Sequence, residues 1–185
     1  MHRVSLALIG VLVAFAGAAL ADDPAPLTDA DVTSFISTLD AANAFGDELD
    51  ADGKTDALEV AMEPKPGEAF KPYSNAVAAM KTKYPTDYVR LGAIVSPLGF
   101  SADNWAATGD RVISAYFAVR MERDNPGAAA QMAAMDPALL ARLPAAHRAD
   151  FEALKALVAT SAAVSPEDRA AVEPHMDALD AEMDD

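Results

Sequence analysis

Apolar residues recur at helical spacing along most of this chain, whereas the alternating pattern of a β-strand is almost absent. Thr28 begins a capping-box-like start, after which one helical face carries Val32, Phe35, Ile36, Leu39 and Ala42. Gly46 is expected to end this first helix. Caps and proline or glycine stops predict further helices over about residues 56–62, 73–83, 87–98, 102–123, 137–143, 144–163 and 166–185, with a short segment over about 128–135. The predicted fold class is therefore all-α, a compact bundle of about six short helices after a cleaved signal peptide.

Composition divides the chain into three parts. Residues 1–21 are predicted to be a signal peptide, residues 22–164 a helical domain, and residues 165–185 a C-terminal helix or a detachable arm. Residues 47–72 are acidic and rich in proline, so we expect a long loop there that contains one short helix. Pro174 should kink the C-terminal helix, because proline removes a backbone donor and clashes with the preceding turn.

The first 21 residues have the three-part layout of a secretory signal peptide. Arg3 lies in a short basic start, residues 6–20 are uncharged and apolar, and Ala19-Leu20-Ala21 offers the small residues that signal peptidase reads. The apolar run is short for a membrane span of about 20 residues. We therefore expect export by the general secretory route, cleavage after Ala21 and a periplasmic location without a stable membrane anchor. An uncleaved N-terminal anchor is the alternative.

The helix predicted from about residue 102 has the strongest apolar stripe, which includes Trp105 and Tyr116. Gly109 lies within it, and a glycine in a helix interior costs about 1 kcal/mol relative to alanine. Two interpretations explain such a glycine. Either another helix crosses here at close range with Trp105 in the core, or a small apolar pocket lies at Gly109 with Asp110 or Arg111 at its rim.

The chain is strongly acidic and contains no cysteine. It has 29 Asp and Glu against 14 Lys and Arg, a formal net charge of −15. Such a surface repels nucleic acid, because binding to phosphates depends on Lys and Arg. It suits cations, basic partners or simple solubility. The absence of cysteine excludes disulfides, thiol catalysis and thiolate metal sites within this chain.

A candidate calcium site lies in the acidic segment from Glu48 to Glu59. If Gly53 takes the sixth position of an EF-hand loop, then Asp50, Asp52, Asp56 and Glu59 fall at positions 3, 5, 9 and 12, where oxygen ligands belong. The hypothesis is that these four residues are metal ligands and that calcium is the cofactor they bind.

The same segment departs from the EF-hand pattern at several points. Glu48 stands where aspartate is expected, Thr55 stands where an apolar residue is usual, and Pro64 follows the segment closely. No second loop of this kind is present. A solvated acidic loop without bound metal is therefore the alternative.

Three segments resemble a family of small exported helical proteins of Gram-negative bacteria, a family of unknown function. They are Leu27 to Val32, the segment Gly99-Phe100-Ser101-Ala102-Asp103-Asn104-Trp105 that continues to Val112, and Ser165 to Arg169. The resemblance implies an all-α fold and a periplasmic location. It carries no catalytic residue over to this chain.

The sequence holds no recognisable catalytic motif. There is no nucleophile elbow, P-loop or dinucleotide fingerprint, and His147 and His175 lack the spacing of paired metal ligands. Met176 and Met183 have the spacing of a core stripe, which we favour over a copper site with His175. We expect a non-enzymatic protein that binds a periplasmic protein or a small ligand, with weak calcium binding as the alternative function.

Overall fold

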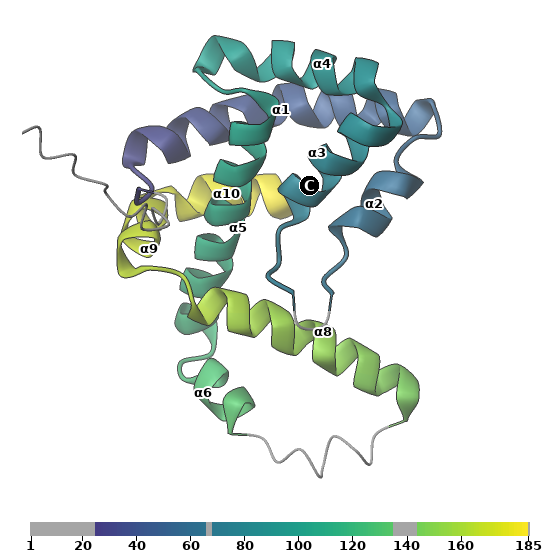
Figure 1. Cartoon of the computed structure of the whole chain (residues 1–185). Coiled ribbons are helices and arrows are strands. Elements are labelled where there is room, and N and C mark those ends of the chain that lie inside the picture. The colour runs from purple at the N-terminus through teal and green to yellow at the C-terminus, as the bar shows by residue number, and fades with distance from the viewer. Residues whose placement is uncertain (1–24, 66–67, 135–143, 185) are drawn as a thin grey trace, which may run out of the picture.

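The computed structural model describes residues 25–65, 68–134 and 144–184, and within them every regular element is a helix (Figure 1). The predicted signal peptide and the predicted helix 137–143 lie outside these residues. The α-helices are α1 (Asp29–Ala51), α2 (Asp56–Met62), α3 (Pro72–Lys83), α4 (Pro85–Val95), α5 (Ala102–Asp124), α6 (Ala128–Ala133), α8 (Ala145–Ala162), α9 (Pro166–Val172) and α10 (Met176–Asp184). The all-α prediction is confirmed, although the described residues hold more helices than the six or so expected.

Helix α5 is the centre of the packing. It contacts α1, α3, α4, α8 and α9, and Figure 1 shows it descending through the middle of the molecule from the level of α1 and α4. Its N-terminus is capped by the Ser101 hydroxyl, which accepts the Asn104 amide at 3.1 Å. Tyr116 and Ala115 are fully buried, and Trp105 is only 6% exposed. The prediction that Trp105 and Tyr116 belong to one buried apolar stripe is confirmed.

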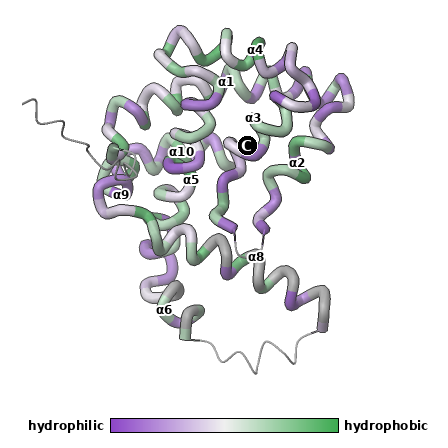
Figure 2. Tube along the Cα trace, in the orientation of Figure 1, coloured by the Kyte–Doolittle hydropathy of each residue, from purple (hydrophilic) through white to green (hydrophobic). Residues whose placement is uncertain are grey.

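Hydrophobic residues are distributed over all the helices, and no helix drawn in Figure 2 is hydrophobic along its whole length. None of the helices in the described ranges is long and apolar enough to cross a membrane.

Helix α1 is longer than the sequence predicted. It continues through Gly46 to Ala51, and the turns added beyond Gly46 bury Leu49 beside the already buried Phe45. The cost of one helical glycine, about 1 kcal/mol, is smaller than the gain of about 1.5–3 kcal/mol from burying a leucine side chain. The expected loop over 47–72 is therefore wrong in its first five residues, whereas the short helix expected at 56–62 is confirmed as α2.

Gly53 ends α1 in a Schellman motif. Its φ of 68° lies in the left-handed region, and its amide donates to the Asp50 carbonyl at 2.8 Å while the Lys54 amide donates to the Leu49 carbonyl at 2.9 Å. The sharp turn that the sequence indicated at this glycine is real. It is the C-terminal cap of a helix, so Asp50 and Asp52 lie in the last turn and cap of α1.

The C-terminal residues form part of the same core as the rest of the chain. Pro174 lies in a short 3₁₀ turn, Glu173–His175, that separates α9 from α10, as the expected kink requires. Val172, Met176 and Leu179 are buried in the cluster that also contains Trp105. The described residues after Ser165 thus form two packed helices with a break at Pro174.

Candidate ligand-binding site

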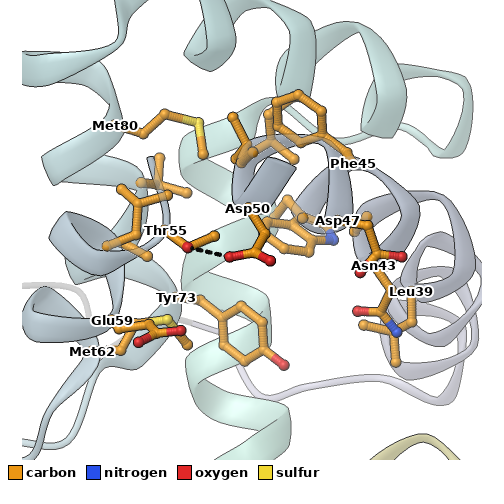
Figure 3. Close-up of a pocket in the computed structure, with 18 residues that line it drawn as sticks. Leu39, Asn43, Phe45, Asp47, Asp50, Thr55, Glu59, Met62, Tyr73 and Met80 are labelled. Atoms are coloured by element: carbon orange, nitrogen blue, oxygen red, sulfur yellow. Dashed lines mark hydrogen bonds between the residues drawn. The ribbon is translucent and has the colours of Figure 1, made fainter. Parts of the chain in front are cut away.

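A cavity of about 480 Å³ lies between α1, α2 and α3. Its walls are mainly apolar and include Leu39, Phe45, Leu58, Met62, Val77 and Met80. Figure 3 shows α1 residues on one side of this space and α2 residues on the other, with Tyr73 between them. The cavity exists because α2 packs against α3 while α1 passes behind it, so three apolar helix faces converge without filling the space.

Two aromatic residues of the cavity wall, Tyr73 and Trp105, belong to a buried cluster of rings with Phe35. The ring centroid of Tyr73 lies 5.3 Å from that of Trp105 and 5.5 Å from that of Phe35, both in edge-to-face arrangements. The Trp105 indole N–H donates to the Thr38 hydroxyl at 2.7 Å, and this hydroxyl donates to the Phe35 carbonyl at 2.6 Å. These bonds satisfy the buried polar atoms and fix the orientation of the rings.

Tyr73 brings a hydroxyl group into this apolar environment. Burial raises the pKa of the Tyr73 hydroxyl to about 12, and the nearby Asp110 carboxylate adds to the increase. The hydroxyl is therefore neutral at physiological pH. The hydroxyl has no hydrogen-bond partner within the part of the chain that the structure describes, and the Tyr73 side chain lines the cavity.

Three carboxylates and one amide surround the apolar wall. Asn43, Asp47 and Asp50 lie on α1, Glu59 lies on α2, and all four are exposed. The Asp50 carboxylate accepts the Thr55 hydroxyl at 2.8 Å (Figure 3). Among the residues that the structure describes, no lysine, arginine or histidine lines the cavity. The rim is thus acidic throughout.

The nearest basic residues are held by carboxylates outside the cavity. The Lys54 ammonium lies 2.9 Å from Asp52 and 2.8 Å from Asp87, and hydrogen bonding to Lys54 is the main reason that the pKa of Asp87 is lowered. The Arg90 guanidinium pairs with Glu48 and lies over the Phe45 ring, 4.9 Å from its centroid. Neither cation neutralises the rim.

The four predicted calcium ligands are not gathered into one site. Asp50 and Asp52 lie at the end of α1, where they bond to Thr55 and Lys54, while Asp56 and Glu59 lie in α2. Within the described residues, no group of three or more acidic or histidine side chains is placed to hold a metal ion. Calcium binding by this segment stays a prediction without a preformed ligand set.

The space next to Gly109 is filled, so the close-crossing interpretation of this glycine is the correct one. A Cβ atom there would lie 2.8 Å from Cε2 of Phe35 and 2.9 Å from Cδ2 of Tyr73. The pocket expected at Gly109 with Asp110 or Arg111 at its rim is therefore wrong, because these two aromatic rings occupy that space.

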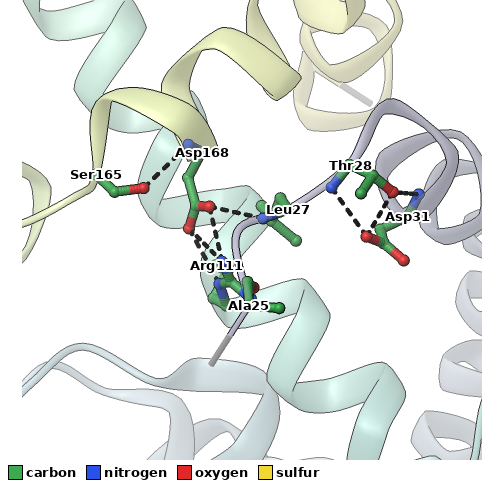
Figure 4. Close-up of polar contacts among 7 residues, drawn as sticks. All are labelled: Ala25, Leu27, Thr28, Asp31, Arg111, Ser165 and Asp168. Carbon is green, nitrogen blue, oxygen red and sulfur yellow. Dashed lines mark hydrogen bonds and ion pairs between the residues drawn. The ribbon is translucent and has the colours of Figure 1, made fainter. Parts of the chain in front are cut away.

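Asp110 and Arg111 instead join distant parts of the chain. The Asp110 carboxylate accepts the Tyr73 amide at 2.8 Å and caps the start of α3. Arg111 makes a bidentate ion pair with Asp168 and donates to the Ala25 carbonyl, while Asp168 accepts the Leu27 amide at 2.8 Å (Figure 4). These bonds fix residues 25–27 against α5 and α9.

The sequence analysis did not find the cavity between α1, α2 and α3. Its apolar residues come from five separate helices and look like ordinary core positions in the sequence. The one available signal was the acidic residues near Gly53, which we interpreted as metal ligands.

Comparison with known proteins adds no further guide, because no protein-family model, curated protein or solved structure matches this chain. The resemblance to exported Gram-negative proteins thus stays untested.

Proposed function

We propose that this chain is an exported, non-enzymatic binding protein that holds a small apolar ligand in the cavity between α1, α2 and α3. The observation that carries the proposal is the cavity itself. Small-molecule sites have volumes of about 300–1,000 Å³, mainly apolar walls and a few polar groups that orient the ligand. A volume of about 480 Å³ with apolar walls, one unpaired tyrosine hydroxyl and polar residues at the rim fits that description.

Export rests on the sequence of residues 1–21, and a periplasmic location is part of the proposal. A periplasmic protein with a ligand-sized apolar cavity is suited to carry or sequester a molecule that dissolves poorly in water. The cavity favours this small ligand over the protein partner that the sequence also left open, because mainly apolar walls from several helices converge around a ligand-sized volume.

Binding is favoured over catalysis by the chemistry of the cavity. The Tyr73 hydroxyl has a raised pKa, which works against its use as a base near neutral pH. The exposed carboxylates at the rim have no buried partner that would prepare them for proton transfer. These groups are suited to hold and orient a ligand.

Trp105 provides a direct assay for this function. It is the only tryptophan in the chain and it lines the cavity, so energy transfer to a neutral apolar fluorophore such as N-phenyl-1-naphthylamine reports binding there. We expect saturable binding with one probe molecule per chain.

Two matched variants on α3 locate the site. Ala76→Leu adds three carbons to a half-buried residue of the cavity wall, whereas Ala78→Leu adds the same atoms at an exposed position outside the cavity. Binding should fall at least tenfold in Ala76→Leu and stay unchanged in Ala78→Leu. If the wild-type protein does not bind the probe saturably, or if both folded variants bind it equally well, the proposal is wrong.

A further inference from the structure

The acidic rim limits the chemical class of the ligand, and this step rests on the proposed function. We infer that the cavity selects a cationic amphiphile, a molecule with an apolar tail and a positively charged head group. The tail would occupy the space between α1, α2 and α3, and the head group would lie among the carboxylates at its edge.

The positions of the rim carboxylates support this inference. Asp47 and Asp50 are three residues apart on α1 and therefore lie on one face of that helix. Glu59 projects from α2 on the other side of the space (Figure 3). A head group between the two helices is thus approached by negative charge from both sides.

These carboxylates are available to a ligand. Asp47 and Glu59 form no ion pair with any residue that the structure describes. Asp50 accepts one hydrogen bond from Thr55 through a single oxygen, and an ionised carboxylate offers about four acceptor positions. All three can therefore face a cation without breaking an existing ion pair.

The surrounding basic residues do not compensate this charge. Lys54 is paired with Asp52 and Asp87, and Arg90 is paired with Glu48 and Asp87, all of them outside the cavity wall. An anionic head group would find no basic partner at the rim and would be repelled by three carboxylates. A neutral head group could donate hydrogen bonds to these carboxylates but would lack the attraction between opposite charges.

The Tyr73 hydroxyl is compatible with the same ligand class. The Tyr73 hydroxyl lacks a partner in the described residues, and a hydroxyl oxygen can accept a hydrogen bond from an ammonium group. The aromatic rings of Tyr73 and Trp105 also line the cavity, and aromatic faces attract organic cations.

The test compares amphiphiles that share one tail and differ in charge. Dodecyltrimethylammonium, dodecyldimethylamine oxide and dodecyl sulfate, each below its micelle concentration, would displace N-phenyl-1-naphthylamine from the full mature chain at neutral pH. The amine oxide has nearly the size of the ammonium but no net charge. We expect the ammonium to bind at least tenfold more tightly than the amine oxide and the sulfate to bind most weakly. This preference should shrink as salt rises from about 0.01 M to about 1 M, because the Debye length falls from about 30 Å to about 3 Å.

A matched pair of double variants separates the rim from the net charge of −15, which attracts any cation. Asp47→Asn with Glu59→Gln removes two rim charges, and Asp40→Asn with Glu122→Gln removes two exposed charges elsewhere. The first pair should reduce the preference for the ammonium at least fivefold, and the second should change it less than twofold.

The outcomes separate the two proposals. Equal affinity for the ammonium and the amine oxide, or an equal loss in both double variants, would overturn the cationic ligand class and leave the apolar cavity in place. If the neutral fluorophore does not bind at all, the proposed function fails and the ligand class fails with it.

Discussion

Replacing Gly109 by alanine tests the close packing at the centre of the fold. The added Cβ atom would lie 2.8 Å from Phe35 and 2.9 Å from Tyr73, closer than carbon atoms approach one another in native proteins. Both neighbours are rings locked against Trp105, so neither can move without disturbing the aromatic cluster. The substitution should therefore destabilise the protein, although alanine is the better helix former.

The magnitude follows from two opposing effects. Overpacking of a well-packed core costs about 1–3 kcal/mol, and replacing a helical glycine by alanine gains up to about 1 kcal/mol. Gly92, in the interior of α4, isolates the second effect because a Cβ atom there meets nothing within 4 Å. Gly92→Ala should thus stabilise the protein by up to about 1 kcal/mol, and Gly109→Ala should be less stable than Gly92→Ala by about 1–3 kcal/mol.

Urea unfolding followed by circular dichroism measures this difference, with thermal unfolding as a second readout. A difference of 1–3 kcal/mol corresponds to roughly 2–12 °C in Tm for a domain of this size. Phe35→Leu should partly relieve the clash, so the double variant with Gly109→Ala should lose less stability than the two single changes predict together. If Gly109→Ala stabilises the protein as much as Gly92→Ala does, the rings of Phe35 and Tyr73 do not pack against Gly109 as closely as the structure shows.

Three further predictions concern the charged groups. Asp168→Asn should destabilise the protein by about 1.5–3 kcal/mol, because it leaves the partly buried Arg111 without its ionised partner. It should also speed hydrogen exchange at the Leu27 amide, which donates to the Asp168 carboxylate. Unchanged urea unfolding and unchanged exchange would contradict this prediction. The lowered pKa of Asp87, due mainly to the hydrogen bond from Lys54, contributes stability that is present above its ordinary pKa of 3.8 and is lost as the pH falls below it. Asp87→Asn should therefore lower stability at pH 7 and flatten its decline as the pH falls below 3.8, and an equally steep acid decline in the variant would refute the assignment. Calcium and magnesium at matched ionic strength should raise Tm equally, because the four predicted ligands do not converge in the described residues. If calcium instead raises Tm more than magnesium does, and if Glu59→Gln removes this difference, the calcium hypothesis is supported.

Local features of the sequence predicted most of the helices. The caps at Thr28, Ser101 and Ser165 act within three residues of their partners, and the apolar period around Trp105 spans one helix. Such signals are readable from sequence because they depend only on neighbours along the chain. The same reasoning explains why the break at Pro174 was predicted correctly.

Gly53 shows where local signals stop. A glycine with positive φ suits both the sixth position of a calcium loop and the end of a helix. The choice depends on whether α1 continues past Gly46, and that is decided by the burial of Phe45 and Leu49 against other helices. Sequence spacing alone does not contain this information.

The sequence by itself therefore determined the helical class, the caps and the central role of the helix that carries Trp105, and it predicts export. Tertiary structure alone decided the candidate site, because the walls of the cavity come from separate helices. The charge of its acidic rim also depends on tertiary structure, because Lys54 and Arg90 form ion pairs with carboxylates outside the cavity. It also decided the bond between Leu27 and Asp168, two residues separated by 141 positions. Helical periodicity acts over a few residues, whereas the cavity and these long-range bonds depend on how whole helices pack against one another.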